Sequence, residues 1–233
     1  ADAVATELVG LESDVNLSVL QGQSLDILES KFIVNDQYGN RITDSTKYDI
    51  KAALINTDSN NGLTVASAEL TTNGKEKITI SASSEAKADN FVFTLAKQAE
   101  GEIIGETVKD AKGNESTIEK KVSVVAASEF VSYEVEQDLG TIYAAESHAK
   151  KVTVYGVTAT GKKVALPSTY YNIIDEKQLS AEASGTVITV TGSDENLDND
   201  ASTTKPDTID AGFKVVINKT GDVLELTGKV TVV

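Results

Sequence analysis

Several residue types that carry enzyme or metal chemistry are missing or scarce in this chain. Of its 233 residues, none is cysteine, methionine or tryptophan, two are proline, and only 5% are aromatic. The absence of cysteine excludes disulfide bonds, thiolate catalysis and cysteine-ligated zinc. The absence of tryptophan and the few other aromatic rings argue against a glycosidase, which would need a platform for a sugar ring.

Histidine is almost as rare, since His148 is the single one. It lies in a polar stretch without a second histidine or a cysteine to share a metal or relay a proton, so we expect an exposed surface residue. The chain also lacks the G-x-S-x-G nucleophile turn and both glycine-rich phosphate-binding patterns. The sequence therefore predicts no catalytic or cofactor-binding residue, and we expect a protein that is not an enzyme.

Positive charge is in short supply, with 21 Lys and Arg against 36 Asp and Glu and a formal net charge of −15. Nucleic-acid phosphates and anionic membrane surfaces both attract clusters of Lys and Arg, so neither is an expected partner. No run approaches the ~18 apolar residues of a membrane span. The chain starts at Ala1 without a charged n-region or an apolar h-region, so we expect a mature or excised segment.

What the chain does contain is an internal repeat. Residues 31–50 (KFIVNDQYGNRITDSTKYDI) match residues 151–173 (KVTVYGVTATGKKVALPSTYYNI), and the alternating run of residues 113–125 returns in residues 221–233. The repeat length of roughly 110 residues suits one domain per copy. We therefore expect two domains, residues 1–126 and residues 127–233.

Short segments in both copies alternate apolar with polar residues, the pattern of a half-buried strand. Asn, Asp and Gly clusters such as DQYGN at 36–40 and DAKGN at 110–114 separate these segments, as turns between antiparallel strands do. Amphipathic helices are missing between them. The pattern predicts an all-β fold of two tandem immunoglobulin-like β-sandwich domains, with about seven strands in each.

Two recurring features invite a functional interpretation and have a structural one as well. Asp36 and Asp110 open matching turns, and we expect their carboxylates to cap those turns. Tyr48, Tyr170 and Tyr171 recur at matching strand starts, where a tyrosine commonly buries its ring and bonds its hydroxyl to the backbone. A carbohydrate-binding stripe is the alternative for these tyrosines, and it would need exposed rings on one face.

The acidic loop of residues 194–210 (DENLDNDASTTKPDTID) belongs to the second copy alone. Its opening resembles an EF-hand loop, but Asn199 and Lys205 stand where that loop needs a Gly and a bidentate Glu. What survives is a group of hard oxygen ligands that could bind calcium, with a solvated acidic loop as the alternative. The candidate calcium ligands are Asp194, Asp198, Asp200 and Asp207.

The segments VNDQYGNRI and VYGVTATGKKV and the endings KVSVV and KVTVV, together with the composition, carry a family resemblance. The chain resembles tandem bacterial immunoglobulin-like domains of a Bacillus-type S-layer protein. The resemblance implies a secreted structural protein of the cell wall that self-assembles into a lattice on the cell surface. Its partners would be further copies of itself and neighbouring domains of its own chain. S-layer proteins of this kind often need calcium, and the cell-wall anchor would lie in other domains.

Two alternatives from other classes remain open on the sequence. The domains could form the stalk of a bacterial adhesin that displays a ligand-binding loop. They could also be accessory or carbohydrate-binding domains of an extracellular hydrolase. An S-layer segment predicts assembly into sheets, whereas an adhesin predicts monomers that bind a ligand.

Overall fold

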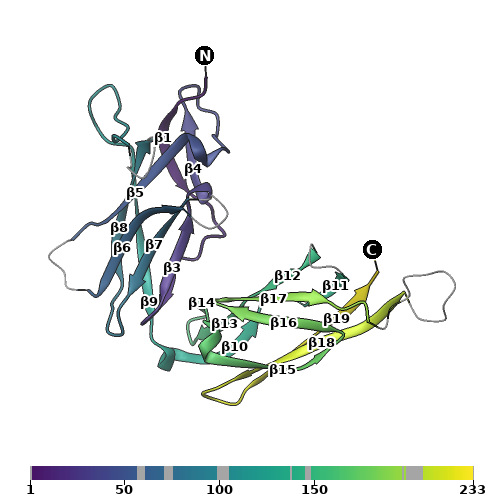
Figure 1. The fold of residues 1–233 in the computed structure, drawn as a ribbon. Helices are drawn as coiled ribbons and strands as arrows, with labels where there is room; N and C mark the ends of the chain where they lie inside the picture. The colour runs from purple at the N-terminus through teal and green to yellow at the C-terminus, as the bar shows by residue number, and fades with distance from the viewer. Residues whose placement is uncertain are drawn as a thin grey trace. The chain divides into compact units, whose positions relative to one another are not determined.

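The computed structural model describes residues 2–56, 61–70, 76–98, 105–136, 138–144, 148–195, 197 and 207–232. In this part of the chain the strands are joined by turns and by single turns of 3-10 helix, without an α-helix. No helix among the described residues is long and apolar enough to cross a membrane. The chain divides into two compact units, Ala1–Ala126 and Ala127–Val233 (Figure 1). The predicted all-β class is confirmed.

The first unit pairs its strands in two layers. One sheet has the order β2-β9-β8-β5, a second has the order β3-β7-β6, and β1 pairs with β4, the strand that follows β3 in the chain. All pairs are antiparallel except β2 with β9. The strands are β1 Ala5–Leu11, β2 Ser18–Leu20, β3 Ser24–Leu28, β4 Phe32–Asp36, β5 Tyr48–Leu54, β6 Leu63–Leu70, β7 Glu76–Ala82, β8 Asp89–Lys97 and β9 Thr117–Val125.

The second unit repeats this arrangement. Its sheets have the orders β11-β19-β18-β15, β12-β17-β16 and β10-β13-β14, and β11 pairs with β19 in parallel (Figure 1). The strands are β10 Phe130–Val135, β11 Gly140–Tyr143, β12 Lys150–Val152, β13 Val154–Thr158, β14 Lys163–Ala165, β15 Tyr171–Lys177, β16 Leu179–Ser184, β17 Val187–Gly192, β18 Thr208–Ile217 and β19 Val223–Thr231. Among the described residues only β14 lacks a counterpart strand, and the isolated bridge between Asn35 and Arg41 takes its place in the first unit.

This strand order is that of an immunoglobulin-like sandwich. In each unit the first strand pairs with one layer, and the next strand crosses to the other layer and runs parallel to the last strand. The second strand of the fold is broken, by the 3-10 turn Glu29–Lys31 in the first unit and by one residue, Thr153, in the second. The predicted tandem immunoglobulin-like fold is confirmed.

The cores consist of the inward positions of the alternating segments, as the sequence pattern predicts. Phe32, Phe91 and Phe93 are fully buried in the first unit, and the rings of Phe32 and Phe93 lie 5.2 Å apart. In the second unit Phe213 is the buried phenylalanine, among aliphatic side chains. Burial of these apolar side chains is the main favourable term in folding each unit.

Candidate functional site

The acidic segment of residues 194–210 begins just beyond β17, and its last three residues already belong to β18. Asp194 and Asp207 are both exposed. The backbone oxygen of Asp194 accepts a hydrogen bond from the buried Leu197 at 3.0 Å, and that of Asp207 accepts one from the Thr231 hydroxyl at 2.9 Å. Asp198 and Asp200 lie outside the described residues. The contact of Asp194 is a local turn, whereas that of Asp207 joins the end of the segment to β19.

Metal binding by the predicted ligands is not tested by this geometry. Within the described ranges, no three His, Cys, Asp or Glu side chains gather in a way that could hold a metal ion. Two of the four candidate ligands fall outside those ranges, so the calcium site stays a prediction.

The carboxylates of the matching turns have the structural role that the sequence indicated. Asp36 Oδ1 accepts hydrogen bonds from the backbone N–H groups of Tyr38 and Asn40, both at 2.8 Å. Asp110 Oδ1 accepts the equivalent pair, from Lys112 and Asn114 at 2.8 Å. These contacts confirm turn capping.

The same hydrogen bonds set the acidity of the turn carboxyls. Burial alone would raise the pKa of Asp36, but the hydrogen bonds from Asn40 and Tyr38 outweigh it and hold the pKa below its ordinary value. Hydrogen bonds from the Asn114 side chain and backbone lower the pKa of Asp110. Both residues are therefore charged at neutral pH, with their charge directed at their own turns.

The two matching tyrosines differ in what their hydroxyls meet. Tyr48 and Tyr171 are both buried, and burial is the main reason that the pKa of each rises to about 12. The Tyr48 hydroxyl donates to the backbone oxygen of Glu29 at 3.3 Å, as expected for this position. The Tyr171 hydroxyl has no hydrogen-bond partner among the described residues, so the expectation fails there. With both rings in the core, these two tyrosines cannot form a carbohydrate-binding stripe.

Glu29 is a buried acid that the sequence did not single out. It lies in the break between β3 and β4, is 1% exposed, and accepts a 2.7 Å hydrogen bond from the backbone N–H of Ile50 through Oε1. This contact ties the broken strand to β5. In the sequence, Glu29 could have been noticed as a carboxylate within a strand pattern. The role of Glu29 is structural.

His148 is exposed, as expected for a surface histidine. Its ring lies 5.5 Å from the ring of Tyr143 at the end of β11.

A hollow of about 690 Å³ lies on the outer face of the sheet β11-β19-β18-β15. Bare backbone and small side chains form its centre. A Cβ at Gly212 would lie 2.5 Å from the Leu226 backbone oxygen, and a Cβ at Gly228 would lie 2.5 Å from that of Gly140, so neither position accepts a side chain. The neighbouring outward residue on β19 is Thr227.

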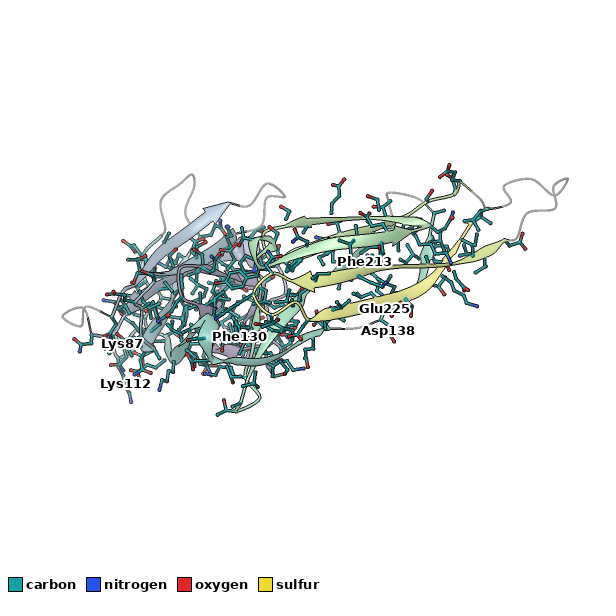
Figure 2. The ribbon with its side chains drawn as sticks, turned by 90° about the horizontal axis from the view of Figure 1, so that it is seen from below. Lys87, Lys112, Phe130, Asp138, Phe213 and Glu225 are labelled. Carbon is teal, nitrogen blue, oxygen red and sulfur yellow. The ribbon has the colours of Figure 1, made fainter. Side chains whose placement is uncertain are left out.

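Charged side chains surround this centre. On one side of it, Asp210 on β18 pairs in register with Lys229 on β19, and on the other side Lys214 pairs in register with Glu225. Glu225 is exposed and the Leu226 that follows it is buried, so Glu225 lies on the outer side of β19 (Figure 2). Its register partner Lys214 lies on the same face of the sheet. We call the six charged residues and their glycine centre the charged face. Its charged members are Asp175, Lys177, Asp210, Lys214, Glu225 and Lys229.

One ion pair lies within the charged face. Lys214 Nζ is 2.8 Å from Asp175 Oδ2, and this contact raises the pKa of Lys214. Asp175 has a φ of 56° in the irregular part of β15, between Ile174 and Lys177. The irregularity brings a carboxylate onto the outer face beside Lys214.

The charged face is not among the sites predicted from the sequence, which all lie in the acidic loop. The available signal was the spacing of the last two strands: Asp210, Gly212 and Lys214 on one, and Glu225, Thr227 and Lys229 on the other. Period two puts each of these sets on one side of its strand. Their alignment, however, depends on the register, which a sequence pattern does not give.

Comparisons with known proteins give similarities to solved structures only. No family model matches the chain, and no curated protein matches it. Domains 5–6 of the S-layer protein SbsC are 17% identical, with 97% of this chain and 98% of that chain covered and a TM-score of 0.42. A longer piece of SbsC is 15% identical over 97% of this chain and 26% of its own length, with a TM-score of 0.45.

The Escherichia coli adhesin FdeC is also similar, at 15% identity over 98% of this chain and 66% of that chain, with a TM-score of 0.30. Solved structures similar to this chain thus include domains of an S-layer protein, the class that its sequence resembles. The immunoglobulin-like fold itself follows from the strand pairing described above.

Proposed function

We propose that this chain is a structural segment of a secreted bacterial protein that self-assembles into a surface layer outside the cell wall. The observation that carries the proposal is the repetition of one strand order in two consecutive units, each with its own buried core. The class of protein comes from the sequence resemblance. The proposed role is non-enzymatic, and its partners are further copies and the neighbouring domains of the same chain.

The physical basis of this role is stiffness. A sandwich with a close-packed core deforms little, so the groups on the surface of each unit keep fixed positions. Each unit can therefore offer an interface of constant shape, and symmetric assemblies are built by repeating such interfaces. The net charge of −15 opposes close approach of copies. Assembly must therefore use surfaces where this repulsion is offset.

Light scattering on the product of the gene that encodes this chain tests the proposal. A surface-layer protein gives scattering that grows with concentration as sheets or tubes form. An adhesin stalk stays monomeric at the same concentrations and binds a ligand instead. Persistent monomers would contradict the proposed function.

Calcium is the second part of the proposal. Asp194, Asp198, Asp200 and Asp207 would bind Ca²⁺ through carboxylate oxygens and reduce the repulsion between acidic copies. In calorimetry, calcium at roughly 100 times its Kd should stabilise the chain by about 2.7 kcal/mol. A variant with all four aspartates changed to asparagine should lose this gain. Identical melts of the parent chain with calcium and with a chelator would contradict calcium binding.

A further inference from the structure

The charged face is electrically balanced in a chain that is strongly acidic. Its lining contains three acidic residues, Asp175, Asp210 and Glu225, and three lysines, Lys177, Lys214 and Lys229. The whole chain has 36 acidic residues against 21 Lys and Arg. Two copies that meet at this face therefore do not repel each other through a net charge there. The face is thus suited to a second copy of this acidic chain.

The charges on β18 and β19 form a checkerboard. Asp210 is opposite Lys229, and Lys214 is opposite Glu225, with Gly212 opposite Thr227 between them. Along β18 the charge changes from negative at Asp210 to positive at Lys214, and along β19 it changes from negative at Glu225 to positive at Lys229. Among the described residues, Asp210, Glu225 and Lys229 take part in no ion pair, so their charges are available to a partner.

A checkerboard of this kind is complementary to itself. If a second copy faces the first across a twofold axis that runs along the strands between β18 and β19, Asp210 of each copy meets Lys229 of the other. Lys214 of each copy then meets Glu225 of the other, and Gly212 meets Thr227. All four charged contacts join opposite signs, and the interface is isologous, as in most homodimers.

The orientation of the axis follows from Lys177. This residue pairs in register with Gly212 from the neighbouring strand β15. An axis perpendicular to the strands would place Lys177 of one copy against Lys177 of the other. With the axis along the strands, Lys177 faces the column of β11 instead. The aligned arrangement also suits two sheets that pack face to face.

The glycine centre removes the steric obstacle to this approach. Gly212 leaves the backbone of β18 exposed on the outer face, Thr227 opposite it has a short side chain, and the long charged side chains surround these two residues. The charged side chains of two copies can therefore make contact without a clash in the middle. Electrostatic complementarity then sets the register of the pair.

The first unit does not have this pattern on its equivalent face. There, Glu119 and Lys121 on β9 are opposite Val92 and Asn90 on β8. The checkerboard is thus particular to the second unit, although both units share the same strands. It is a difference between the copies that the shared fold does not require.

We propose that the charged face of the second unit pairs with the same face of a second copy of this chain. This proposal rests on the proposed surface-layer function, because it names one interface through which copies would assemble. Its test uses residues 1–233 alone in solution, so it can fail while the gene product still assembles through other surfaces.

Sedimentation at low salt over concentrations up to about 1 mM measures the pairing. The variants Lys229→Glu and Asp210→Lys each put two like-charge contacts into the pair, and each should weaken dimerisation at least about tenfold. An equimolar mixture of the two variants should dimerise as the parent chain does, because the reversed charge at position 229 of one variant then meets the reversed charge at position 210 of the other. Lys121→Glu and Glu119→Lys on β9 are the matched controls and should leave dimerisation unchanged.

Circular dichroism of each variant checks its folding. Lys214→Glu with Glu225→Lys supplies a second pair, and their mixture should again dimerise more strongly than either variant alone. Three results would overturn the proposal. They are a parent chain that stays monomeric up to the highest concentration, single variants that dimerise as well as the parent, and a mixture that does not regain dimerisation.

Discussion

At the scale of single residues, Tyr48 and Tyr171 show how equivalent positions come to differ. Both begin the strand after a 3-10 turn and both are buried. In the first unit the broken strand places the Glu29 carbonyl within reach of the hydroxyl. The shorter break in the second unit contains no such turn, and the Tyr171 hydroxyl has no partner among the described residues.

This difference predicts that the same substitution has different effects on stability at the two positions. Tyr48→Phe removes a buried hydrogen bond and should lower the free energy of unfolding by about 1 kcal/mol. Tyr171→Phe removes a buried hydroxyl without a partner and should leave stability unchanged or raise it by up to about 1 kcal/mol. Urea unfolding followed by circular dichroism compares the two. Equal losses would show that the Tyr171 hydroxyl is bonded in solution.

The Asp110 turn predicts a pH effect. Because hydrogen bonds lower the folded-state pKa of Asp110, its contribution to stability is present above its ordinary pKa of 3.8 and is lost as the pH falls through the lower folded value. Asp110→Ala should therefore lower the melting temperature at pH 7. The gap between variant and parent should close in acid. A gap that persists at the lowest pH would mean that the charge of Asp110 does not hold the turn.

Among the secondary-structure elements, β10 and β13 are held together by the Phe130 ring of β10, which lies over Gly156 of β13. A Cβ at Gly156 would lie 2.7 Å from the ring of Phe130, which also packs edge-on against Tyr133 with the centroids 6.1 Å apart. The ring covers the bare backbone of the neighbouring strand, an arrangement that stabilises glycine within sheets. Phe130 thereby fixes the first strand of the second unit to its layer.

Gly156→Ala should displace the Phe130 ring and lower the free energy of unfolding by about 1–3 kcal/mol. Gly10→Ala in β1 is the control, because no atom lies within 4 Å of a Cβ there, and it should be neutral or slightly stabilising. Thermal unfolding of both variants measures the two changes in stability. Equal effects would mean that Phe130 does not need the space above Gly156.

The core positions of the strands could be predicted from the sequence, whereas the register between strands could not. Alternation placed Phe32, Phe93 and Phe213 in the cores, because period two and apolar burial are local properties of the chain. The pairing of Asp210 with Lys229 was beyond reach, because it depends on strand register. The candidate ligands Asp198 and Asp200 lie outside the described residues, so their prediction is untested.

At the scale of the whole molecule, the chain divides between Ala126 and Ala127 into two units, each with its own core. We expect residues 1–126 and residues 127–233 to fold independently when they are produced separately. Each should unfold cooperatively, as small domains usually do. Circular dichroism and thermal melts of the two fragments measure this. A fragment that stays unfolded alone would show that its core depends on the other unit.

In the proposed function, rigid immunoglobulin-like units are the building blocks of an ordered surface layer. Electron microscopy of the purified gene product, with and without calcium, tests it most directly. We expect sheets or tubes with a regular lattice, which form more readily when calcium is present. Single dispersed particles under all these conditions, from a protein that is folded and of full length, would contradict it.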